Sequence, residues 1–425
     1  MTSRARVVVA LFLIALWAAF ATGRNSYFNL AYLWGGLLLI SYLWSRFSLD
    51  GVWVERQPRS LRAQVGRTFE EKFILENRSR ILKLWVEIRD NSNLPGHRAS
   101  VVHSRIEKGR KKIWIVRTMC TRRGRFRLGT AELHSGDPFG LFPRTRILPT
   151  THHLVVLPKM ENIHSLNLKT GRLPGGESLR LRTHQVTPNA AGVRDYAAGD
   201  GFNRIHWKST ARRQRLIAKE FEFDPRAEVW IVLDAQENVH AGKVQEVSGI
   251  LVSSVIYGDF ELPKVTEEYA IAIVASLALY FYKRDRELGF IAHGAARHIL
   301  QSNRGEAQLL RILESLAVMQ AKGTNSLAAT LKVEGSRITR GASVIIVTPS
   351  VEAHTISAAQ ELMRSGIMPL LVLIDARSFG GRSGSEKLAK AAQSSGIPVH
   401  LIRYGDSIAQ SFSQHQGQSR WIPAA

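Results

Sequence analysis

Two unbroken apolar runs occupy the start of the chain. The first covers residues 7–22 and the second covers residues 27–44, with a short polar turn between them. Each run is close to the roughly 17–25 residues that a helix needs to cross a bilayer, and aromatic residues recur near the ends, as they do at membrane interfaces. Because the turn is so short, the pattern predicts a tight hairpin of two membrane helices, which forms an anchor over residues 1–47.

The first run also admits a second interpretation, as a cleaved secretory signal peptide. The motif Ala19-Phe-Ala resembles the small-residue pattern that precedes a cleavage site. However, Arg4 and Arg6 precede the first run and Arg46 follows the second, and cytoplasmic segments are enriched in Lys and Arg. We therefore expect an uncleaved, multi-pass anchor in the cytoplasmic (inner) membrane with the soluble domains facing the cytoplasm. Cleavage of the first run remains the open alternative.

A period-two alternation of apolar and polar positions follows the second run. The clearest alternating stretches are separated by turn-forming residues and occupy residues 52–56, 68–75, 82–88, 112–116, 126–128 and 154–157. Short alternating strands with regularly spaced turns are typical of two packed antiparallel sheets. The pattern predicts a β-sandwich of immunoglobulin-like type over residues 48–158, whose ligand the fold alone does not identify.

One turn in this region, at residues 137–142, carries three large apolar side chains. Asp137 begins the turn, because the residue before a proline is disfavoured in the helical conformation. Phe139, Leu141 and Phe142 then require burial. A structural turn is the favoured interpretation, and a binding loop is the alternative.

The pattern of apolar and polar positions changes again after residue 226. Nearly continuous apolar stretches, which are typical of parallel strands covered on both faces, alternate with stretches of helical periodicity. The predicted strands cover residues 228–234, 288–292, 343–348, 369–374 and 399–403, and the predicted helices cover residues 267–286, 306–320, 357–364 and 387–393. This alternation predicts a doubly wound α/β domain with a parallel sheet over residues 227–406, followed by a tail at residues 407–425.

Composition adds a strong positive charge. Lys and Arg number 58 against 35 acidic residues, so the net charge is +23. This excess favours acidic partners such as anionic lipids, nucleic acids or acidic protein surfaces, although a solvated basic surface explains it equally well. The single cysteine, Cys120, excludes an intrachain disulfide and a cysteine-based zinc site.

The familiar motifs of catalysis are missing from the sequence. It contains no glycine-rich phosphate loop, no nucleophile elbow after a strand and no His-Glu-x-x-His metal motif. We therefore expect a protein that is not an enzyme.

The stretch at residues 193–213, inside a segment at 159–226 that joins the two halves, combines aromatic and cationic residues. We expect Tyr196 and Trp207 to anchor this joint with their polar ends bonded. Arg204, Lys208 and Arg212 recur every four residues, so a helix would place them in one stripe. The stripe either pairs with nearby acidic residues, which we favour, or binds phosphates or an acidic partner. No aromatic platform accompanies it, so specific nucleic-acid binding is not expected, and no small-molecule ligand is indicated.

This stretch resembles the signature of the "domain of unknown function 58" family. The matching residues are Arg194, Tyr196, Gly199, Asp200, Arg204, Trp207, Lys208 and Arg212. His206 stands where many members carry an aspartate, and residues 137–142 also match the family. The resemblance implies a bacterial or archaeal membrane-anchored protein with a von Willebrand factor A-like C-terminal domain, of a kind commonly encoded beside MoxR-type AAA+ ATPases.

The von Willebrand A-like resemblance also implies a candidate metal site. Such domains bind a divalent metal through an Asp-x-Ser-x-Ser loop, a threonine and a further aspartate. Asp234 and Thr324 match this pattern, whereas Gln236 and Asn238 stand at the serine positions and Thr348 ends the strand expected to carry the second acid. Mg²⁺ prefers oxygen ligands in octahedral geometry. A degenerate Mg²⁺ site is therefore one hypothesis, and a metal-free fold is the favoured alternative.

These patterns together lead to one expected function and one alternative. We expect a membrane-anchored, non-enzymatic interaction or adaptor protein that contacts the bilayer through residues 7–44. The resemblance implies that it acts with a MoxR-type ATPase in assembling or activating protein complexes or in envelope function. The alternative is a divalent-metal-dependent hydrolase or phosphate-binding enzyme that uses Asp234 and Thr324.

Overall fold

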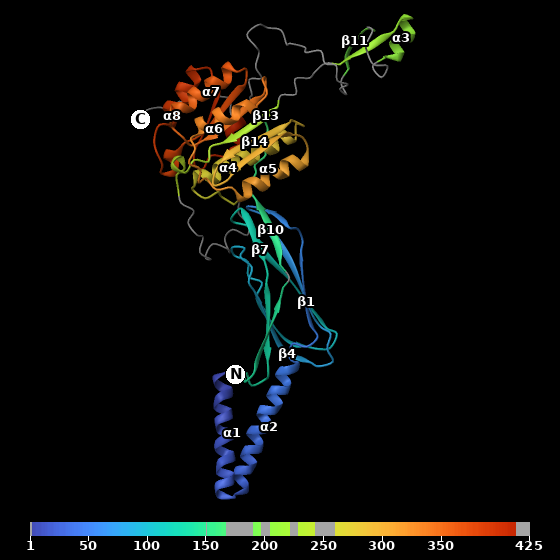
Figure 1. The fold of residues 1–425 in the computed structure, drawn as a ribbon, viewed down its shortest axis with the longest axis vertical. Helices are drawn as coiled ribbons and strands as arrows, with labels where there is room; N and C mark the ends of the chain where they lie inside the picture. The colour runs from blue at the N-terminus through green and yellow to red at the C-terminus, as the bar shows by residue number, and fades with distance from the viewer. Residues whose placement is uncertain are drawn as a thin grey trace, which may run out of the picture. The chain divides into compact units, whose positions relative to one another are not determined.

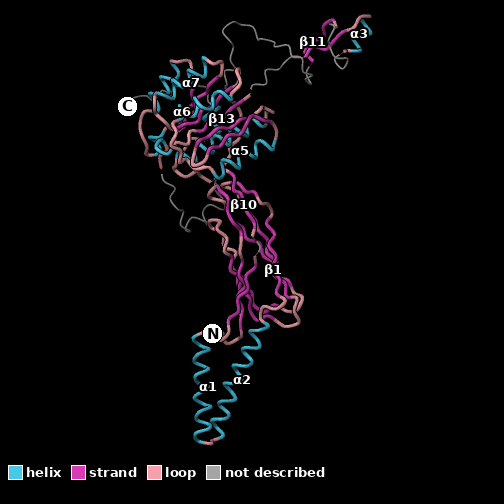
Figure 2. The backbone as a smooth tube through the Cα atoms, in the orientation of Figure 1, coloured by secondary structure: helices cyan, strands magenta, loops and turns pink. Residues whose placement is uncertain are grey.

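The structure is a computed structural model that describes residues 2–149, 151–166, 190–196, 205–221, 228–242 and 260–413. The chain divides into two compact units (Figure 1). The first comprises residues 1–158 and 246–261, and the second comprises residues 159–245 and 262–425. The first unit contains an N-terminal helical hairpin and a β-rich region, and the second is an α/β unit, as Figure 2 shows in cyan and magenta.

The hairpin consists of α1 (Ser3–Thr22) and α2 (Asn25–Phe47), which pack side by side. Both helices are long and apolar enough to cross a membrane. Thr2 caps α1 by accepting a hydrogen bond from the backbone N–H of Ala5, so the helix begins before the apolar run itself. Gly23 adopts the left-handed conformation (φ 66°) and ends α1. The predicted pair of apolar helices is confirmed.

The loop at residues 137–142 holds both ends of the hairpin. Thr2 Oγ1 donates a hydrogen bond to the carbonyl oxygen of Leu141 at 3.0 Å, and Ser45 Oγ donates to that of Phe142 at 2.6 Å. The buried Asp137 carboxylate organises the loop by accepting from the backbone N–H groups of Phe139, Leu141 and Phe142. These contacts support the structural-turn interpretation. Leu141 is buried as expected, but Phe139 is 54% exposed.

Three cations from the β-rich region cover the carbonyl end of α2. Lys83 Nζ donates to the carbonyl oxygen of Phe47 at 2.6 Å, and Arg144 donates to that of Arg46. Arg146 donates to the carbonyl oxygens beyond the helix, including that of Leu49 at 3.2 Å. The last carbonyls of a helix lack partners within it and carry partial negative charge, so Lys83 and Arg144 satisfy and neutralise those of α2.

The β-rich region contains ten strands in three sheets. The strands are β1 (Val52–Pro58), β2 (Arg62–Gln64), β3 (Thr68–Asn77), β4 (Lys83–Asp90), β5 (Val101–Ile106), β6 (Lys111–Met119), β7 (Gly124–Leu128), β8 (Ala131–Gly136), β9 (Pro143–Leu148) and β10 (His152–Leu157). The sheets have the orders β1-β3-β6, β5-β4-β8-β9 and β2-β10-β7. All neighbouring strands pair antiparallel except β10 with β2.

The first two sheets face each other across a hydrophobic core. Leu75 of β3 packs there with Val86 and Ile88 of β4 and with Leu133 of β8, and all four side chains are fully buried. The other end of β3 enters a second core through Phe69, which packs with residues of β7 and β10. β3 therefore belongs to both cores, and the predicted packing of antiparallel sheets is confirmed at the level of a β-rich unit.

A cluster of buried charges links three strands of this unit. Arg56 of β1 lies 2.9 Å from Glu71 of β3 and 2.7 Å from Asp90 of β4. His97 Nε2 lies 3.3 Å from Glu71, while its Nδ1 lies 2.9 Å from the hydroxyl of Thr118. The charged side chains are at most 2% exposed. Buried charges are stable only when paired, so the cluster makes the three strands depend on one another.

The α/β unit is built on one six-stranded sheet. Its strands are β13 (Val229–Leu233), β14 (Leu288–His293), β15 (Arg297–Asn303), β16 (Ser343–Thr348), β17 (Met368–Ile374) and β18 (Val399–Ile402). Their spatial order is β15-β14-β13-β16-β17-β18, and every neighbouring pair is parallel except β14 with β15. The predicted parallel α/β sheet is confirmed, with one antiparallel edge strand that the sequence pattern did not predict.

Helices cover this sheet. They are α4 (Thr266–Tyr282), α5 (Glu306–Val318), α6 (Leu327–Glu334), α7 (His354–Arg364), α8 (Ser385–Ser394) and α9 (Ile408–Ser413). α4 packs with α5, while α7 packs with both α6 and α8. Side chains of α6, α7 and α8 share a core with Trp230 and Val232 of β13. The helix α6 is absent from the sequence prediction.

Candidate functional site

The strand order creates a switch point between β13 and β16. The chain moves from β13 to β14 and β15 on one side and from β16 to β17 and β18 on the other. In open α/β sheets, ligands bind outside the carboxyl ends of the strands at such a point. Asp234 directly follows β13 and Thr348 ends β16, so the structure brings these two residues together at the switch point.

Asp234 is 2% exposed, and both of its carboxylate oxygens are occupied. Oδ2 accepts a hydrogen bond from the hydroxyl of Thr348 at 2.6 Å, and Oδ1 accepts from the backbone N–H of Gln236 at 3.2 Å. The Thr348 hydroxyl in turn accepts from the N–H of Ser350 at 2.9 Å. Burial raises the pKa of Asp234, although the hydrogen bonds from Thr348 and Gln236 oppose it.

Two further side chains support this loop. His240 Nε2 lies 2.9 Å from the carbonyl oxygen of Asp234, and His240 Nδ1 lies 3.1 Å from the hydroxyl of Thr266 at the start of α4. Because a carbonyl only accepts, Nε2 carries a proton. Neither residue is predicted from the sequence, since a lone histidine in a loop and a threonine at a helix start carry no distinctive signal.

The loop that carries Thr324 is bonded to the Asp234 loop. Gly323 N–H donates to the carbonyl oxygen of Ala235 at 2.9 Å, and Glu237 N–H donates to that of Gly323 at 2.9 Å. A Cβ atom on Gly323 would lie 2.0 Å from the carbonyl oxygen of His293, so only glycine permits this approach. Thr324 itself is exposed. The structure therefore places Thr324 beside the Asp234 loop, at the solvent-facing rim.

This donor set fits a magnesium ion poorly. Asp234 supplies the carboxylate, but burial favours its neutral form and both oxygens already accept hydrogen bonds. Among the residues that the structure describes, no three His, Cys, Asp or Glu side chains gather as a metal would require.

The magnesium hypothesis remains a prediction, which calorimetric titration of the protein with Mg²⁺ would test. Heat released by the wild type but not by Asp234→Asn would support it.

Asp234→Asn also tests the ionisation of this carboxyl. Because the pKa of Asp234 is raised in the folded state, the folded protein binds more protons than the unfolded chain above about pH 4. The contribution of this carboxyl to the free energy of unfolding therefore declines as pH rises through the folded pKa. We expect the stability of the α/β unit of Asp234→Asn, measured by hydrogen exchange, to exceed that of wild type increasingly as pH rises above about 4. The control is Asp285→Asn, whose side chain is 82% exposed. A difference independent of pH would contradict the prediction.

The family-like signature forms a small separate motif. Strands β11 (Ala190–Asp195) and β12 (Ile217–Phe221) pair antiparallel, and α3 (Trp207–Arg213) lies between them in sequence. Ile205 and Ala218 are buried and form a bridge beside the strands. His206 caps α3, because its Nδ1 accepts from the backbone N–H of Ser209 at 3.2 Å. An aspartate at this position would cap in the same way, so the substitution preserves the role.

The exposure of α3 corrects one prediction. Trp207 is 64% exposed and does not anchor a joint, because a helix of seven residues buries only the side next to its strands. Lys208 and Arg212 are exposed on α3, as the predicted stripe requires. Tyr196 is half-buried, and its N–H bonds the carbonyl oxygen of Leu216 at 3.0 Å.

The remaining signature residues are only partly described. Arg194 pairs with Ala218 in the β11–β12 register, while Gly199, Asp200 and Arg204 lie outside the described residues. Asp195 is one of the acids expected to pair with the stripe, but its carboxylate lies 3.2 Å from Arg215, which is not a stripe residue. Both partners are more than half exposed, so this pair contributes little to stability.

Comparison with known proteins places this signature in a family of unsettled function. Residues 192–367 match the family model described as "Protein of unknown function DUF58". The curated "Uncharacterized protein YeaD" from Bacillus subtilis (strain 168) is 22% identical over 240 residues, covering 56% of this chain and 54% of that protein. The chain thus spans about half the length of this relative.

Solved structures are more distant. The CARDB domain of the PF1109 protein from Pyrococcus furiosus, determined in complex with di-metal ions, aligns with 25% of this chain and 87% of that domain at 13% identity, with a TM-score of 0.20. A cycloisomaltooligosaccharide glucanotransferase from Paenibacillus sp. aligns with 83% of this chain and 53% of that protein at 10% identity, with a TM-score of 0.17. Neither likeness carries an argument about fold or function.

Proposed function

Because the chain belongs to the DUF58 family of proteins of unknown function, we propose that it is a membrane-anchored interaction protein without enzymatic activity of its own. Its partner is an AAA+ ATPase of MoxR type, for which it acts as an adaptor in assembling or activating other protein complexes. The partner follows from the family resemblance, and the mode of contact follows from the surface of the signature segment.

The exposed face of α3 is the observation that carries this proposal. Trp207 is 64% exposed, and Leu216, just before β12, is 43% exposed. Lys208 and Arg212 are exposed on the same short helix. Tryptophan and arginine are the residues that most often dominate protein–protein binding energy, and large apolar side chains in water are typical of contact sites. The surface therefore suits a partner that offers an apolar pocket with acidic residues around it.

The N-terminal hairpin supports the anchoring part of the proposal. Its two helices have the length and apolar character of membrane spans. Arg4, Arg6 and Arg46 lie at the open ends of the hairpin, which favours an inner-membrane protein whose β-rich region and α/β unit face the cytoplasm. The antiparallel edge strand and the strand order of the sheet support a von Willebrand A-like α/β unit, and the facing sheets support an immunoglobulin-like β unit.

Substitution of Trp207 tests the contact surface. We expect Trp207→Ala to lower the recovery of an AAA+ ATPase by about 30-fold, since a central interface tryptophan contributes about 2 kcal/mol or more. The measurement is affinity purification of the full-length protein from detergent extracts of its own host, followed by quantitative mass spectrometry.

The matched control is Trp53→Ala, which removes another tryptophan that is 50% exposed, on β1. Recovery of the ATPase should be unchanged in this control. Equal recovery by the two variants would rule out α3 as the contact surface, and the absence of any AAA+ ATPase from the wild-type sample would rule out the proposed partner.

A further inference from the structure

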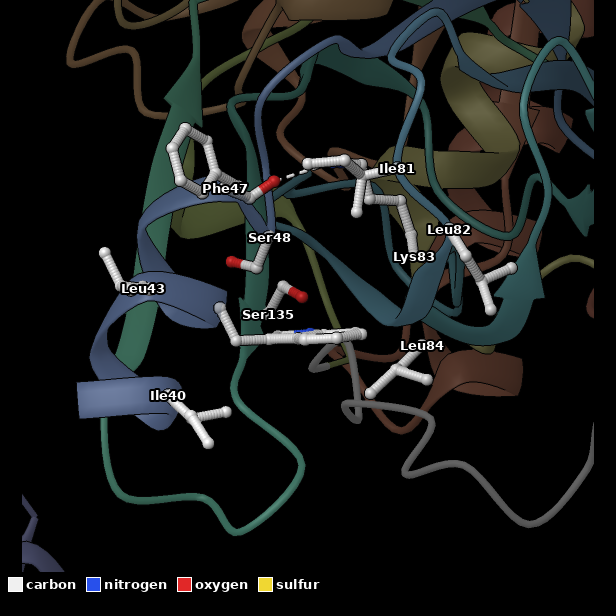
Figure 3. Close-up of a pocket in the computed structure, with 10 residues that line it drawn as sticks. Ile40, Leu43, Phe47, Ser48, Ile81, Leu82, Lys83, Leu84 and Ser135 are labelled. Carbon is white, nitrogen blue, oxygen red and sulfur yellow. Dashed lines mark hydrogen bonds between the residues drawn. The ribbon is translucent and has the colours of Figure 1, made fainter. Parts of the chain in front are cut away.

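A cavity of about 280 Å³ lies between the end of α2 and the start of β4 (Figure 3). Apolar side chains dominate its walls. On the helix these include Ile40, Leu43 and Phe47, and on the opposite wall they are Ile81, Leu82 and Leu84. Figure 3 shows the helix residues and the β4 residues on opposite sides of the space. Every part of the cavity belongs to the first unit.

The position of the cavity along α2 places it at the expected surface of the bilayer. α2 has 23 residues, and at 1.5 Å per residue it is about 34 Å long, slightly more than the roughly 30 Å hydrocarbon core. The last turns of α2 therefore lie at the boundary between acyl chains and headgroups. Ile40 is 59% exposed and Ile81 is 44% exposed, so both walls of the cavity present apolar surface at this level.

Each wall also carries an exposed arginine next to a lining residue. Arg46 directly precedes Phe47, and Arg80 directly precedes Ile81. The Arg46 side chain is 56% exposed, and its contact with Asp50 is long, at 3.9 Å. Cationic residues beside a membrane helix attract anionic headgroups. The site therefore combines an apolar slot with an exposed arginine that is adjacent in sequence to a lining residue of each wall.

We propose that this cavity binds an anionic phospholipid. One acyl chain occupies the space between α2 and β4, and the headgroup phosphate contacts Arg46 and Arg80. An apolar cavity of about 150 Å³ accepts benzene, so the larger volume of this cavity, about 280 Å³, holds a segment of an acyl chain. The inference rests on the proposed function, because the hairpin must lie in a bilayer for a lipid to reach the cavity.

Native mass spectrometry of the full-length protein tests this site. The purified protein is exchanged into mild detergent with equal amounts of phosphatidylglycerol and phosphatidylcholine, and the bound lipid is counted. Leu84→Trp fills the cavity, and Leu33→Trp adds the same ring to a residue of α2 that is 62% exposed and does not line it. We expect wild type and Leu33→Trp to retain phosphatidylglycerol and Leu84→Trp to retain about tenfold less, since each buried methylene contributes to lipid binding. Equal retention by the two tryptophan variants would overturn the proposal.

The headgroup contact is tested separately with Arg46→Gln/Arg80→Gln. Each arginine contributes about fivefold to the preference for an anionic lipid, so the double variant should lose most of its preference for phosphatidylglycerol. A wild-type protein that retains both lipids equally would overturn the proposal.

Extraction of wild-type membranes with alkaline carbonate separates this inference from the proposed anchor. Release of the protein would overturn both. Resistance to extraction, together with equal lipid retention by Leu84→Trp and Leu33→Trp, would overturn the lipid site alone.

Discussion

Replacement of Arg56 by methionine is expected to lower the free energy of unfolding of the β-rich unit by about 3–5 kcal/mol. The guanidinium donates to both carboxylate oxygens of Glu71, at 2.9 and 3.0 Å, and to Asp90 at 2.7 Å. Methionine fills much of the same space but leaves two carboxylates, each at most 2% exposed, without their cation. A buried charge that loses its partner retains its desolvation cost, and this cost makes the loss large.

Arg59→Met is the matched control for this change. Arg59 also pairs with a glutamate, Glu70, at 3.1 Å, but its side chain is 81% exposed. Exposed pairs contribute at most about 1 kcal/mol. Hydrogen exchange of peptides from β1 and β3, measured on the full-length protein in detergent, compares the two variants. Losses of similar size would show that the buried cluster does not stabilise the unit.

The effect of Arg56→Met should also depend on pH. Burial acts to raise the pKa of Glu71, but the contacts from His97 and Arg56 outweigh it and hold this pKa below its ordinary value. The stabilisation linked to a lowered carboxyl pKa is complete above the unfolded value, about 4.3, and is lost as pH falls through the folded pKa. The difference between wild type and Arg56→Met should therefore be full at neutral pH and shrink below about pH 4. A difference that stays constant into acid would contradict this account.

Gly289→Ala is expected to destabilise the α/β unit by about 3 kcal/mol, the upper part of the usual range for overpacked cores. Gly289 of β14 lies directly opposite Trp230 of β13. An added Cβ would lie 2.4 Å from atoms of the Trp230 ring. The ring has little freedom to move, since it is 1% exposed and its Nε1–H donates to Glu228 at 2.9 Å.

A double variant checks that the Trp230 ring causes this loss. In a Trp230→Leu background, the added methyl should cost less than about 1 kcal/mol, because the smaller side chain leaves room for it. Gly335→Ala is the control in the same unit, since its Cβ would meet Leu362 at an ordinary 3.5 Å. Denaturant unfolding followed by hydrogen exchange measures all of these variants. An equal cost of Gly289→Ala in both backgrounds would assign the strain to another contact.

The sequence predicts most of the strands with buried apolar side chains and misses most of the strands at the edges of sheets. Seven of the described strands were not predicted by the pattern, and six of them, β2, β5, β9, β11, β12 and β15, lie at the edges of their sheets, while β8 lies inside its sheet. In β9, the sequence Pro-Arg-Thr-Arg-Ile-Leu alternates half-buried and exposed positions without a fully buried one. An edge strand needs only backbone pairing on one side, so its apolar signal is weak. By contrast, β13 and β16 are fully buried, and the pattern predicts both within one residue.

The candidate site shows a similar division. Asp234 and Thr348 are predictable, because polar residues that end buried parallel strands meet at one edge of the sheet. The contact of His240 with Thr266 depends on how a loop folds back onto α4, and no local pattern records it. The expectation that Trp207 anchors the joint rests on its large, amphipathic side chain. Trp207 is exposed because α3 and its two neighbouring strands are too short to cover its side chain.

The contacts at the end of α2 have a mechanical consequence. Lys83 and Arg144 bind its final carbonyls and Arg146 binds a carbonyl just beyond it, while the loop at residues 137–142 holds Thr2 and Ser45. These hydrogen bonds restrain rotation of the β-rich region relative to the two helices. A force on that region is transmitted directly to both helices, and in the proposed membrane-anchored state the helices would pass it to the bilayer.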